Sequence, residues 1–344
     1  MKPLARPRVA AHIASMIKPG LVQKREIINL IREFFTDRGY FEIETPLLVP
    51  SPAMEATLHG FETQYLDHQG TATRFFLPTS PEFAIKKALH HCNGPIFEIA
   101  RVFRNRGELG PLHRPEFNML EWYEAGDYTR SMASCEDLIH FLSQQFNGLA
   151  QRSTFSWDPP FPRKTTAELF QERVDLDLAR GLSDPEYWRS ACSTVLATPI
   201  PADESFDDLF FRVWLSFIEP RLGLDQPLIV TDYPASMAAL ARLKPEDERW
   251  AERWELYVDG LELGNAFGEL TDSAEQARRF HTSNTERRAL GLEEHPVDQE
   301  LIAAVGQLSE TTGVAIGVER LCMALTAAAD IDTFFLQPWP QPEG

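Results

Sequence analysis

The stretch VFRNRGELGPLHRPEFNMLEWY, residues 102–123, decides how this chain is interpreted. It begins at the end of the buried run PIFEIARVF and closes within FNMLEWYEA, and the apolar residues of both segments predict strands. The loop between them, Asn105 to Arg114, gathers cations although the whole chain has a formal net charge of -18. A local cluster of cations in an acidic protein predicts a site for one anion. A solvated hairpin loop without function is the alternative that the loop alone leaves open.

The composition limits the classes of protein that fit. The chain has 344 residues, 43% of them hydrophobic and 24% charged, which is ordinary for a globular protein with a sizeable core. Its acidic balance argues against extensive nucleic-acid binding. The four cysteines are far apart and include no Cys-x-x-Cys pair, which predicts neither a disulfide framework nor a zinc cluster and favours a reducing compartment.

Targeting signals are also missing from the sequence pattern. No run approaches the ~20 apolar residues of a membrane span, and residues 1–20 lack the apolar core of a secretion signal. We therefore expect a cytoplasmic protein with no membrane association.

Upstream of the opening stretch the pattern predicts a helix and then a strand. Apolar residues recur at helical spacing from Val22 to Asp37, and Gly39 ends that helix. The segment YFEIETPLLVP, residues 40–50, alternates and predicts a strand with Phe41 and Ile43 facing inward, broken by Pro46.

A second helix is predicted over TSPEFAIKKALHH, residues 79–91. Ser80 is suited to the N-cap position, and Pro81 is suited to the first helical turn. Glu82 then lies near the positive end of the helix dipole.

The segment ELYVDGLELGNAFGEL, residues 255–270, carries two carboxylates of interest. Asp259-Gly260 between alternating apolar residues predicts a two-residue hairpin turn. Glu255 and Glu262 then share one face, a diagonal of ~7–8 Å apart, where they can hold Mg²⁺ together with phosphate oxygens. A merely solvated hairpin face is the alternative, and the hairpin alone favours it.

The same segment poses a problem of parity. Asn265, Phe267 and Glu269 share a face with one another, but in a regular strand that face is opposite to the face of Glu262. A β-bulge near Gly264 is needed to bring both groups into one pocket.

A third stretch, TTGVAIGVERLCMAL, covers residues 311–325. Its small residues Gly313, Ala315 and Gly317 allow a close approach to the backbone, and a helix follows with Glu319 and Arg320 at its start. An arginine in the first helical turn opposes the helix dipole, so we expect Arg320 to face an anion or an aromatic ring. A solvated arginine is the alternative for this motif in isolation.

Together these stretches resemble the three motifs of class II aminoacyl-tRNA synthetases. GYFEIETP resembles motif 1, centred on Pro46; VFRNRGELGPLHRPEF resembles motif 2, with Arg104 as its arginine; and GVAIGVERL resembles motif 3, with Arg320. The match runs from about Val22 to Thr326. It implies an α/β (α+β) fold, in which an antiparallel sheet is flanked by helices, and a homodimer formed through motif 1.

Within the class, TSPE, HRPEFNMLEWY and NAFGEL are similar to the lysine-pocket segments of lysyl-tRNA synthetases. Only Met1 to Gly20 precede the motif 1 helix, which leaves no room for an anticodon-binding barrel. The sequence therefore resembles the truncated lysyl-tRNA synthetase paralogues that attach (R)-β-lysine to translation elongation factor P. Ser80 and Ala315 stand where the synthetases usually have alanine and glycine, and the extra methyl at Ala315 changes the shape of the pocket.

This resemblance implies a division of the chain. We expect a flexible leader over residues 1–20, one catalytic domain over residues 21–336 with a mainly helical insertion around residues 165–225, and a tail over residues 337–344.

The resemblance also implies a reaction and its site residues. The carboxylate of (R)-β-lysine or lysine attacks the α-phosphate of ATP, and a lysine of elongation factor P then takes the acyl group from the adenylate. Arg104 and Arg320 are the implied catalytic residues, and Glu255 and Glu262 the implied Mg²⁺ ligands. ATP would be bound by Arg104, Glu108, His113, Phe117, Glu255, Glu262 and Arg320. The amino acid would be bound by Ser80, Glu82, Glu121, Tyr123, Asn265, Phe267, Glu269 and Ala315.

The loop of motif 2 departs from the family pattern. Arg106 and Gly107 intervene before Glu108, so we assign to Glu108 the contact with the adenine edge, and Arg114 replaces a usual asparagine. Two alternatives remain: a lysine-activating paralogue that acts on tRNA or another acceptor, and a non-catalytic amino-acid sensor. The net charge argues against tRNA, and the retained phosphate and metal residues argue against a sensor.

Overall fold

The computed structural model describes residues 17–55, 58–89, 91–92, 94–150 and 155–340. Most of the predicted leader and half of the predicted tail lie outside these residues. The described part is built on one nine-stranded sheet and a separate two-stranded hairpin. In the described part no helix is both long and apolar enough to cross a membrane. All four cysteines are free thiols, as the sequence predicts.

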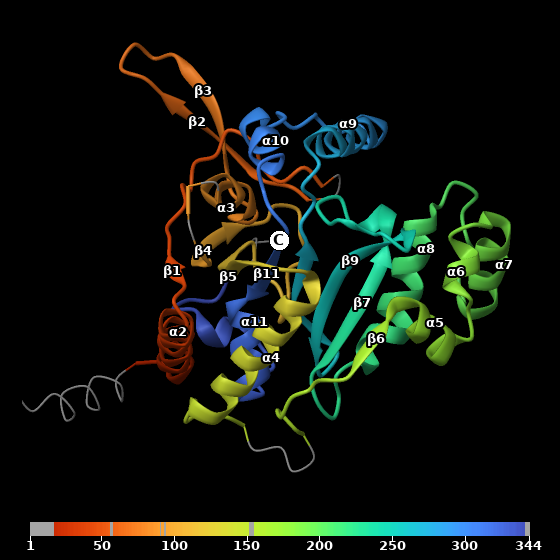
Figure 1. The fold of residues 1–344 in the computed structure, drawn as a ribbon, viewed down its shortest axis with the longest axis horizontal. Coiled ribbons are helices and arrows are strands. Elements are labelled where there is room, and N and C mark those ends of the chain that lie inside the picture. The colour runs from red at the N-terminus through yellow and green to blue at the C-terminus, as the bar shows by residue number, and fades with distance from the viewer. Residues whose placement is uncertain (1–16, 56–57, 90, 93, 151–154, 341–344) are drawn as a thin grey trace, which may run out of the picture.

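The large sheet is antiparallel through its centre and parallel only at its edges. Its strands follow the order β1-β4-β5-β11-β10-β9-β7-β6, and β8 pairs with β9 (Figure 1). The pairs β1–β4 and β6–β7 are parallel. This arrangement confirms the predicted fold class. The bounds are β1 (Phe41–Glu42), β4 (Ile96–Phe103), β5 (Glu116–Ala125), β6 (Arg163–Thr165), β7 (Leu228–Pro234), β8 (Leu243–Lys244), β9 (Asp247–Val258), β10 (Leu261–Gly268) and β11 (Thr311–Gly317).

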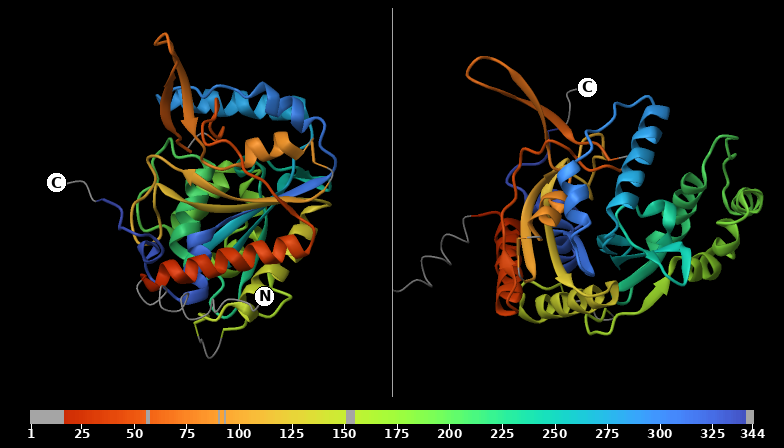
Figure 2. Two further views of the ribbon diagram at one scale, coloured as in Figure 1. Left: turned by 90° about the vertical axis from the view of Figure 1, so that its left-hand side faces the viewer. Right: turned by 45° about the horizontal axis from the view of Figure 1, so that its top comes forward.

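One face of the sheet is apolar and is covered by helices. α2 (Pro19–Asp37), α4 (Tyr128–Gln145) and α11 (Val318–Thr326) pack against it and against one another (Figure 2). Their shared core includes Phe35, Phe97, Trp122 and Trp254. Because successive strand residues point to opposite faces, the neighbours of these aromatic residues point away from the core. The opposite face of the sheet is therefore polar in its centre.

The polar face is bordered by other elements. Figure 1 shows α3 (Glu82–Leu89), α9 (Ser273–Ala289) and α10 (Gln299–Val305) on that side, and the hairpin of β2 (Phe61–Leu66) and β3 (Ala72–Leu77) projecting beyond them. Ser80 Oγ accepts a hydrogen bond from the backbone N–H of Glu82 at 2.9 Å, which supports the predicted capping role.

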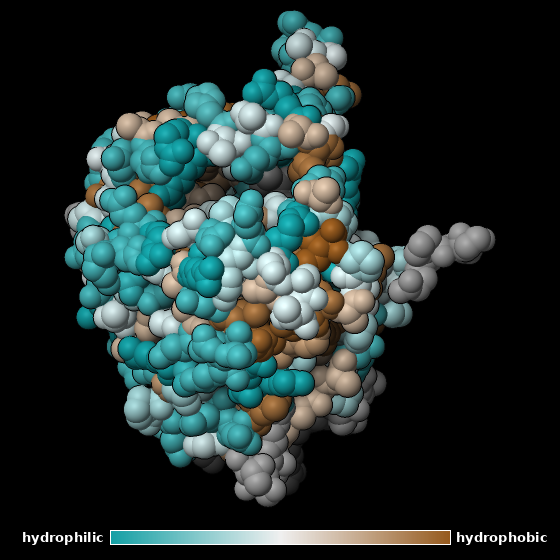
Figure 3. All heavy atoms as spheres, turned by 90° about the vertical axis from the view of Figure 1, so that its right-hand side faces the viewer, coloured by the Kyte–Doolittle hydropathy of each residue, from teal (hydrophilic) through white to brown (hydrophobic). Residues whose placement is uncertain are grey.

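A group of helices lies at the β6 and β7 end of the sheet. It consists of α5 (Thr166–Val174), α6 (Leu178–Gly181), α7 (Pro185–Val195), α8 (Phe206–Val213) and a π-helical turn (Trp214–Ile218). Phe170, Trp188, Phe210 and Trp214 form part of a core of its own. The face turned outward there is mainly hydrophilic, with apolar side chains interspersed (Figure 3). The proposed division of the chain into a domain and an insertion stays a prediction.

The predicted helix near the N-terminus is confirmed, but its start is earlier. It begins at Pro19, which suits a first helical position, rather than at Val22. It ends as predicted, because Gly39 takes a φ of +80° that disfavours other residues.

The strand predicted after this helix is wrong in part. Phe41 and Glu42 pair with β4, and farther along the segment Val49 makes one isolated bridge to Phe76 of β3; the side chain of Phe41, predicted to face inward, is 70% exposed. The reason is that β1 is an edge strand, and no described element of this chain covers Phe41.

Candidate active site

A cavity of about 710 Å³ opens on the polar face of the sheet. Its walls come from segments far apart in the sequence, which the fold brings together. Twelve of the fifteen residues that the resemblance assigns to ATP, Mg²⁺ or the amino acid line it: Ser80, Glu82, Arg104, Glu108, His113, Phe117, Glu121, Glu262, Asn265, Phe267, Ala315 and Arg320. Glu255, Tyr123 and Glu269 do not line the cavity and are buried beside or beneath it.

The hairpin of β9 and β10 carries the predicted bulge. Glu262 lies opposite Tyr257, whereas Gly264 lies opposite Leu256, so Leu263 is the extra residue. Asn265 then pairs with Glu255, which brings it to the face of Glu262. The sequence prediction of a bulge near Gly264 is confirmed, and the parity problem is solved by it.

The neighbouring glycines make room for this arrangement. A Cβ atom at Gly264 would lie 2.1 Å from the carbonyl oxygen of Ala315, so only glycine fits between these strands. The turn is also as predicted, because Asp259 and Gly260 both take positive φ values of 54° and 69°.

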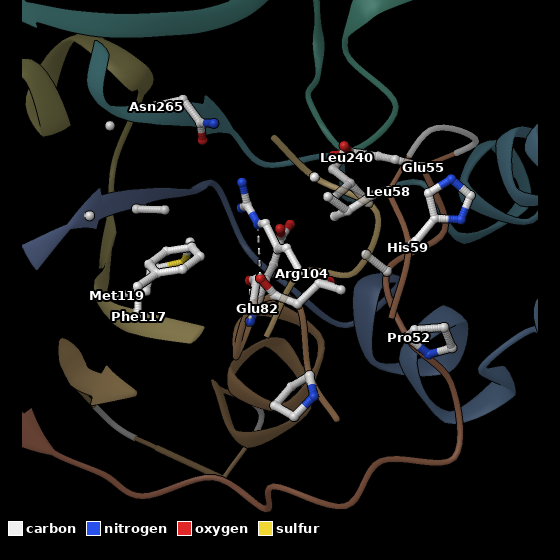
Figure 4. A pocket seen from close by; sticks show the side chains of 18 of the residues that line it. Pro52, Glu55, Leu58, His59, Glu82, Arg104, Phe117, Met119, Leu240 and Asn265 are labelled. Atoms are coloured by element: carbon white, nitrogen blue, oxygen red, sulfur yellow. Dashed lines mark hydrogen bonds between the residues drawn. The ribbon is translucent and has the colours of Figure 1, made fainter. Parts of the chain in front are cut away.

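Arg104 extends into the middle of the cavity from the end of β4 (Figure 4). Among the described residues its guanidinium makes one hydrogen bond, from Nε to the Thr79 carbonyl at 3.4 Å, and it lies 5.4 Å from the centre of the Phe117 ring. Burial lowers the pKa of Arg104, which nevertheless stays far above neutrality for a guanidinium. The terminal nitrogens of this cation are therefore well placed for an anionic ligand.

Arg320 and His113 meet at the other side of the cavity. Arg320 Nη2 lies 2.5 Å from His113 Nε2, and Arg320 Nη1 donates to the backbone carbonyl of Glu262 at 2.9 Å. Burial first, and then the charge of Arg320, lower the pKa of His113. A neutral His113 can accept the hydrogen bond from Arg320. Since the aromatic contact of Phe117 is made with Arg104, an adenine sandwich between Phe117 and Arg320 stays a prediction.

The two carboxylates assigned to Mg²⁺ differ in their burial and in their hydrogen-bond partners. Glu255 is 5% exposed, and both its oxygens accept hydrogen bonds, one from the hydroxyls of Tyr233 and Tyr257 and the other from Arg253. Glu262 borders the cavity, and its closest cation is Arg320 at 3.9 Å.

The charges around this pair favour a bound cation. Burial, and then the charge of Glu255, raise the pKa of Glu262. Burial, then Glu262 and then Glu255, raise the pKa of Glu219 to about 7. A cation would relieve this repulsion. The described residues contain no group of three or more metal-ligating side chains, so a divalent ion here needs oxygens from a ligand such as phosphate. With that addition Glu262 fits Mg²⁺ directly, and Glu255 fits it on exchanging one of its present partners.

Carboxylates also gather on the side of the cavity near α3. Glu121 accepts hydrogen bonds from Ser80 Oγ at 2.6 Å and from the Tyr123 hydroxyl at 3.2 Å. Burial, and then the charge of Glu82, raise the pKa of Glu121 to about 8. Glu82 also lines the cavity. Two carboxylates in one small space suit a ligand with two ammonium groups.

Glu269 has a partner that the sequence pattern does not assign. Its side chain is completely buried, and Oε2 lies 2.6 Å from Lys86 Nζ. Lys86 lies one helical turn after Glu82, with its Nζ 2.5 Å from Glu82 Oε1. The four-residue spacing of Glu82 and Lys86 in TSPEFAIKK is the signal that could have identified Lys86 as a partner of these carboxylates. Gly313 is required next to this pair, because a Cβ there would lie 2.4 Å from Glu269 Oε1 and 2.4 Å from the Tyr123 ring.

Two further residues were not found from the sequence. Arg253 lines the cavity, stacks over Tyr233 with its guanidinium 4.7 Å from the ring centre, and holds Glu255. Glu55, on the segment before β2, also lines the cavity (Figure 4). Neither position carries a local pattern that separates it from an ordinary charged residue.

The motif 2 loop is open at its centre. Glu108 is 87% exposed in its side chain and lies 3.9 Å from His113, so its assigned contact with adenine stays a prediction. Arg114 is held by the C-terminal segment: its Nη1 lies 2.7 Å from Asp332, and its guanidinium is 3.7 Å from the centre of the Phe335 ring. The C-terminal segment therefore neutralises this arginine.

The comparisons with known proteins agree with this geometry. A family model described as "tRNA synthetases class II (D, K and N)" matches residues 5–340. The chain belongs to this class II tRNA synthetase family, whose members use ATP to activate an amino acid.

Its relatives carry a more particular name. The chain is 37% identical over 327 residues to the "Elongation factor P--(R)-beta-lysine ligase" of Proteus mirabilis. The aligned region covers 94% of each chain. Proteins of the same name from Hamiltonella defensa and an Enterobacter species are 35% and 36% identical, and each match covers more than nine tenths of both chains.

The raised pKa of Glu121 predicts a pH dependence. An ammonium ligand binds the ionised carboxylate, which becomes the major form only above the raised pKa of Glu121, about 8 in the free protein. We expect kcat/KM for a diamine substrate to rise between pH 6 and pH 8, with a slope of at most about tenfold per pH unit. Pyrophosphate exchange measured across this range, with a Glu121→Gln variant beside the wild type, checks it. A profile that is flat from pH 6 to 8 in the wild type would contradict this role of Glu121.

Proposed function

We propose that this chain is an ATP-dependent ligase that activates (R)-β-lysine as an adenylate and transfers it to a lysine side chain of elongation factor P. The observation that carries the proposal is that one cavity is lined both by Arg104, a cation suited to a phosphate, and by two carboxylates, Glu82 and Glu121. The names of the relatives support the same substrates.

The first step joins the amino acid to the nucleotide. A carboxylate oxygen of the substrate attacks the α-phosphorus of ATP, and the bond to pyrophosphate breaks. No protein nucleophile is needed, so the protein contributes positioning and charge stabilisation. Arg104 offers planar N–H donors to the α-phosphate oxygens, and Arg320 with His113 binds the nucleotide farther along the wall. Mg²⁺ bound at Glu262 and Glu255 would supply positive charge to the phosphates.

The second step transfers the acyl group to the acceptor. The ε-amine of a lysine on the acceptor protein attacks the acyl carbon of the adenylate, and AMP leaves with the bonding electrons. The ammonium produced by this attack loses a proton to give the amide. The open side of the cavity at Glu108 is where an acceptor side chain could enter.

The preference for the β-amino acid rests on Ala315. This residue lies on β11 between Glu121 of β5 and Asn265 of β10, and it lines the cavity. Its methyl group fills space next to the carboxylate that would hold a substrate ammonium. One methyl group in a binding pocket changes relative affinity by about 1–3 kcal/mol, which is a preference between two isomers.

We also propose that the protein is a homodimer. Phe41, Leu47 and Leu48 of the motif 1 region are exposed, and a partner protomer would cover them. Sedimentation of the purified protein tests this, and a monomer at micromolar concentration would contradict it.

The function is tested with two substrates and two acceptors. We expect pyrophosphate exchange to be faster with (R)-β-lysine than with α-lysine, and labelled (R)-β-lysine to appear on elongation factor P and not on tRNA. Equal or better use of α-lysine would contradict the proposed substrate. Transfer to tRNA alone would contradict the proposed acceptor, and no exchange with either amino acid would favour a sensor.

A further inference from the structure

The C-terminal segment, residues 330–339, contacts the second half of the motif 2 loop. It contains a 3₁₀-helical turn, Ile331–Phe334, which Asp330 caps by accepting the backbone N–H of Asp332 at 2.8 Å. Ile331 also borders the cavity. The end of the chain is therefore part of the wall of the candidate active site.

Two contacts join the loop to this segment, and His113 lies between them. Before His113, the carbonyl oxygen of Pro111 accepts a hydrogen bond from the backbone N–H of Ile331 at 2.8 Å. After it, Arg114 Nη1 lies 2.7 Å from Asp332 Oδ1. Because both sides of His113 are fixed, this part of the loop cannot shift without breaking one of the two contacts.

The contact of Arg114 is more than an exposed ion pair. Its side chain is only 9% exposed, and Nη1 also donates to the carbonyl of Gln337 at 3.1 Å. The guanidinium lies 3.7 Å from the centre of the Phe335 ring and 5.4 Å from that of Trp339. An ion pair and an aromatic contact shielded from water are stronger than the same groups at an open surface.

The fixed half of the loop is the half that meets the nucleotide-binding arginine of motif 3. His113 Nε2 lies 2.5 Å from Arg320 Nη2, whereas residues 106–110 are exposed. A displacement of about 1 Å at a group that positions a substrate can cost about 100-fold in rate. The order of the C-terminal segment therefore matters for the place of His113 and, through it, of Arg320.

We propose, building on the proposed function, that Arg114 is a positioning residue for ATP: held by Asp332 and Phe335, it fixes the motif 2 loop on the C-terminal segment and keeps His113 against Arg320. Arg114 borders the cavity, but its charge is balanced by Asp332, so it acts through His113 and not on a phosphate. An asparagine, which is usual at this position in the family, carries no charge and would not form this ion pair.

The first test compares Arg114→Met with Asp332→Asn. Each variant breaks the ion pair from one side, so we expect both to raise the KM for ATP by about three- to tenfold, with the KM for (R)-β-lysine within about twofold of the wild type. A phosphate-binding Arg114 predicts the opposite for Asp332→Asn, because release from Asp332 would free the guanidinium for ATP. Pyrophosphate exchange gives the KM values, and calorimetry with a non-hydrolysable ATP analogue gives the affinity directly.

The second test asks whether Arg114 acts through His113. In a His113→Ala background we expect Arg114→Met to change the affinity for the analogue by less than about twofold, because the group that it positions is already absent. Effects that multiply in the double variant would mean that the two residues act independently.

Arg101→Met is the matched control. Arg101 and Glu116 form an ion pair of 2.9 Å between the two strands that flank the same loop, but both side chains are about two fifths exposed and neither contacts the C-terminal segment through this pair. Its affinity for the analogue should equal that of the wild type. Arg114→Lys, which keeps the charge, should stay within about threefold of the wild type. The melting temperature of each variant checks its folding.

Three results would overturn the inference: an unchanged KM for ATP in Arg114→Met, an Asp332→Asn variant that binds the analogue as tightly as the wild type or more tightly, and independent effects of Arg114→Met and His113→Ala. Asp332→Asn keeps the test open even if Arg114→Met does not fold. Failure of the proposed function is distinct from these results, because the wild type itself would then show no exchange with (R)-β-lysine.

Discussion

Replacing Glu262 by glutamine is expected to abolish adenylation while the fold stays intact. Glu262 borders the cavity, and of the two carboxylates assigned to Mg²⁺ it is the one whose oxygens are open to a ligand, because those of Glu255 accept hydrogen bonds from Tyr233, Tyr257 and Arg253. Glutamine keeps the shape of the side chain and removes its charge. The loss of a group that stabilises transition-state charge lowers kcat by about 100–1,000-fold, and we expect the upper end of this range.

The measurement is pyrophosphate exchange at saturating (R)-β-lysine, with the melting temperature as the check on folding. Glu248→Gln is the control, because Glu248 lies on β9 with Glu255 but is exposed and does not line the cavity. It should retain wild-type exchange. Full activity of Glu262→Gln would remove Glu262 from the metal and phosphate site.

Replacing Arg104 is the second large effect that we expect. Lysine at this position keeps a positive charge but loses the planar donors that bind two phosphate oxygens at once. We expect Arg104→Lys to lower kcat for adenylate formation by about 100-fold and Arg104→Ala by about 1,000-fold. The KM for ATP should change less than kcat, because this contact strengthens as charge develops on the α-phosphate.

Arg101→Lys is the control for this series. Arg101 lies on the same strand, β4, but its guanidinium pairs with Glu116 at 2.9 Å and does not line the cavity. Its kcat should equal that of the wild type. An Arg104→Lys variant with unchanged kcat, or one in which only the KM for ATP rises, would show that Arg104 binds the ground state and has no special role in the transition state.

The sequence pattern predicted the hairpin and its bulge because both follow from local rules. Asp259-Gly260 selects the turn, and the side-chain alternation of a strand made it clear that Glu262 and Asn265 needed an extra residue between them. The positions of Arg104 and Arg320 in one cavity followed from the resemblance of two motifs to one family, and the structure places both there.

Other predictions failed or were incomplete because they depend on neighbours that are distant in the sequence. Phe41 was predicted to face inward from its alternation with Glu42, but β1 is an edge strand and leaves it exposed. The assignment of Glu255 to Mg²⁺ stays a prediction, but the sequence did not indicate that Tyr233 and Arg253 hold its carboxylate. No pattern within β9 indicates the tyrosine of β7.

The amino-acid sequence by itself determined the turn between β9 and β10, the bulge in β10 and the family. Each of these depends on residues a few positions apart or on matched motifs. Only the tertiary structure decided which charges neutralise one another. Lys86 of α3 and Glu269, the residue after β10, lie far apart in the chain, and the fold brings their charged groups to 2.6 Å. Burial strengthens the interaction between charges that face each other, and the fold alone sets which charges those are.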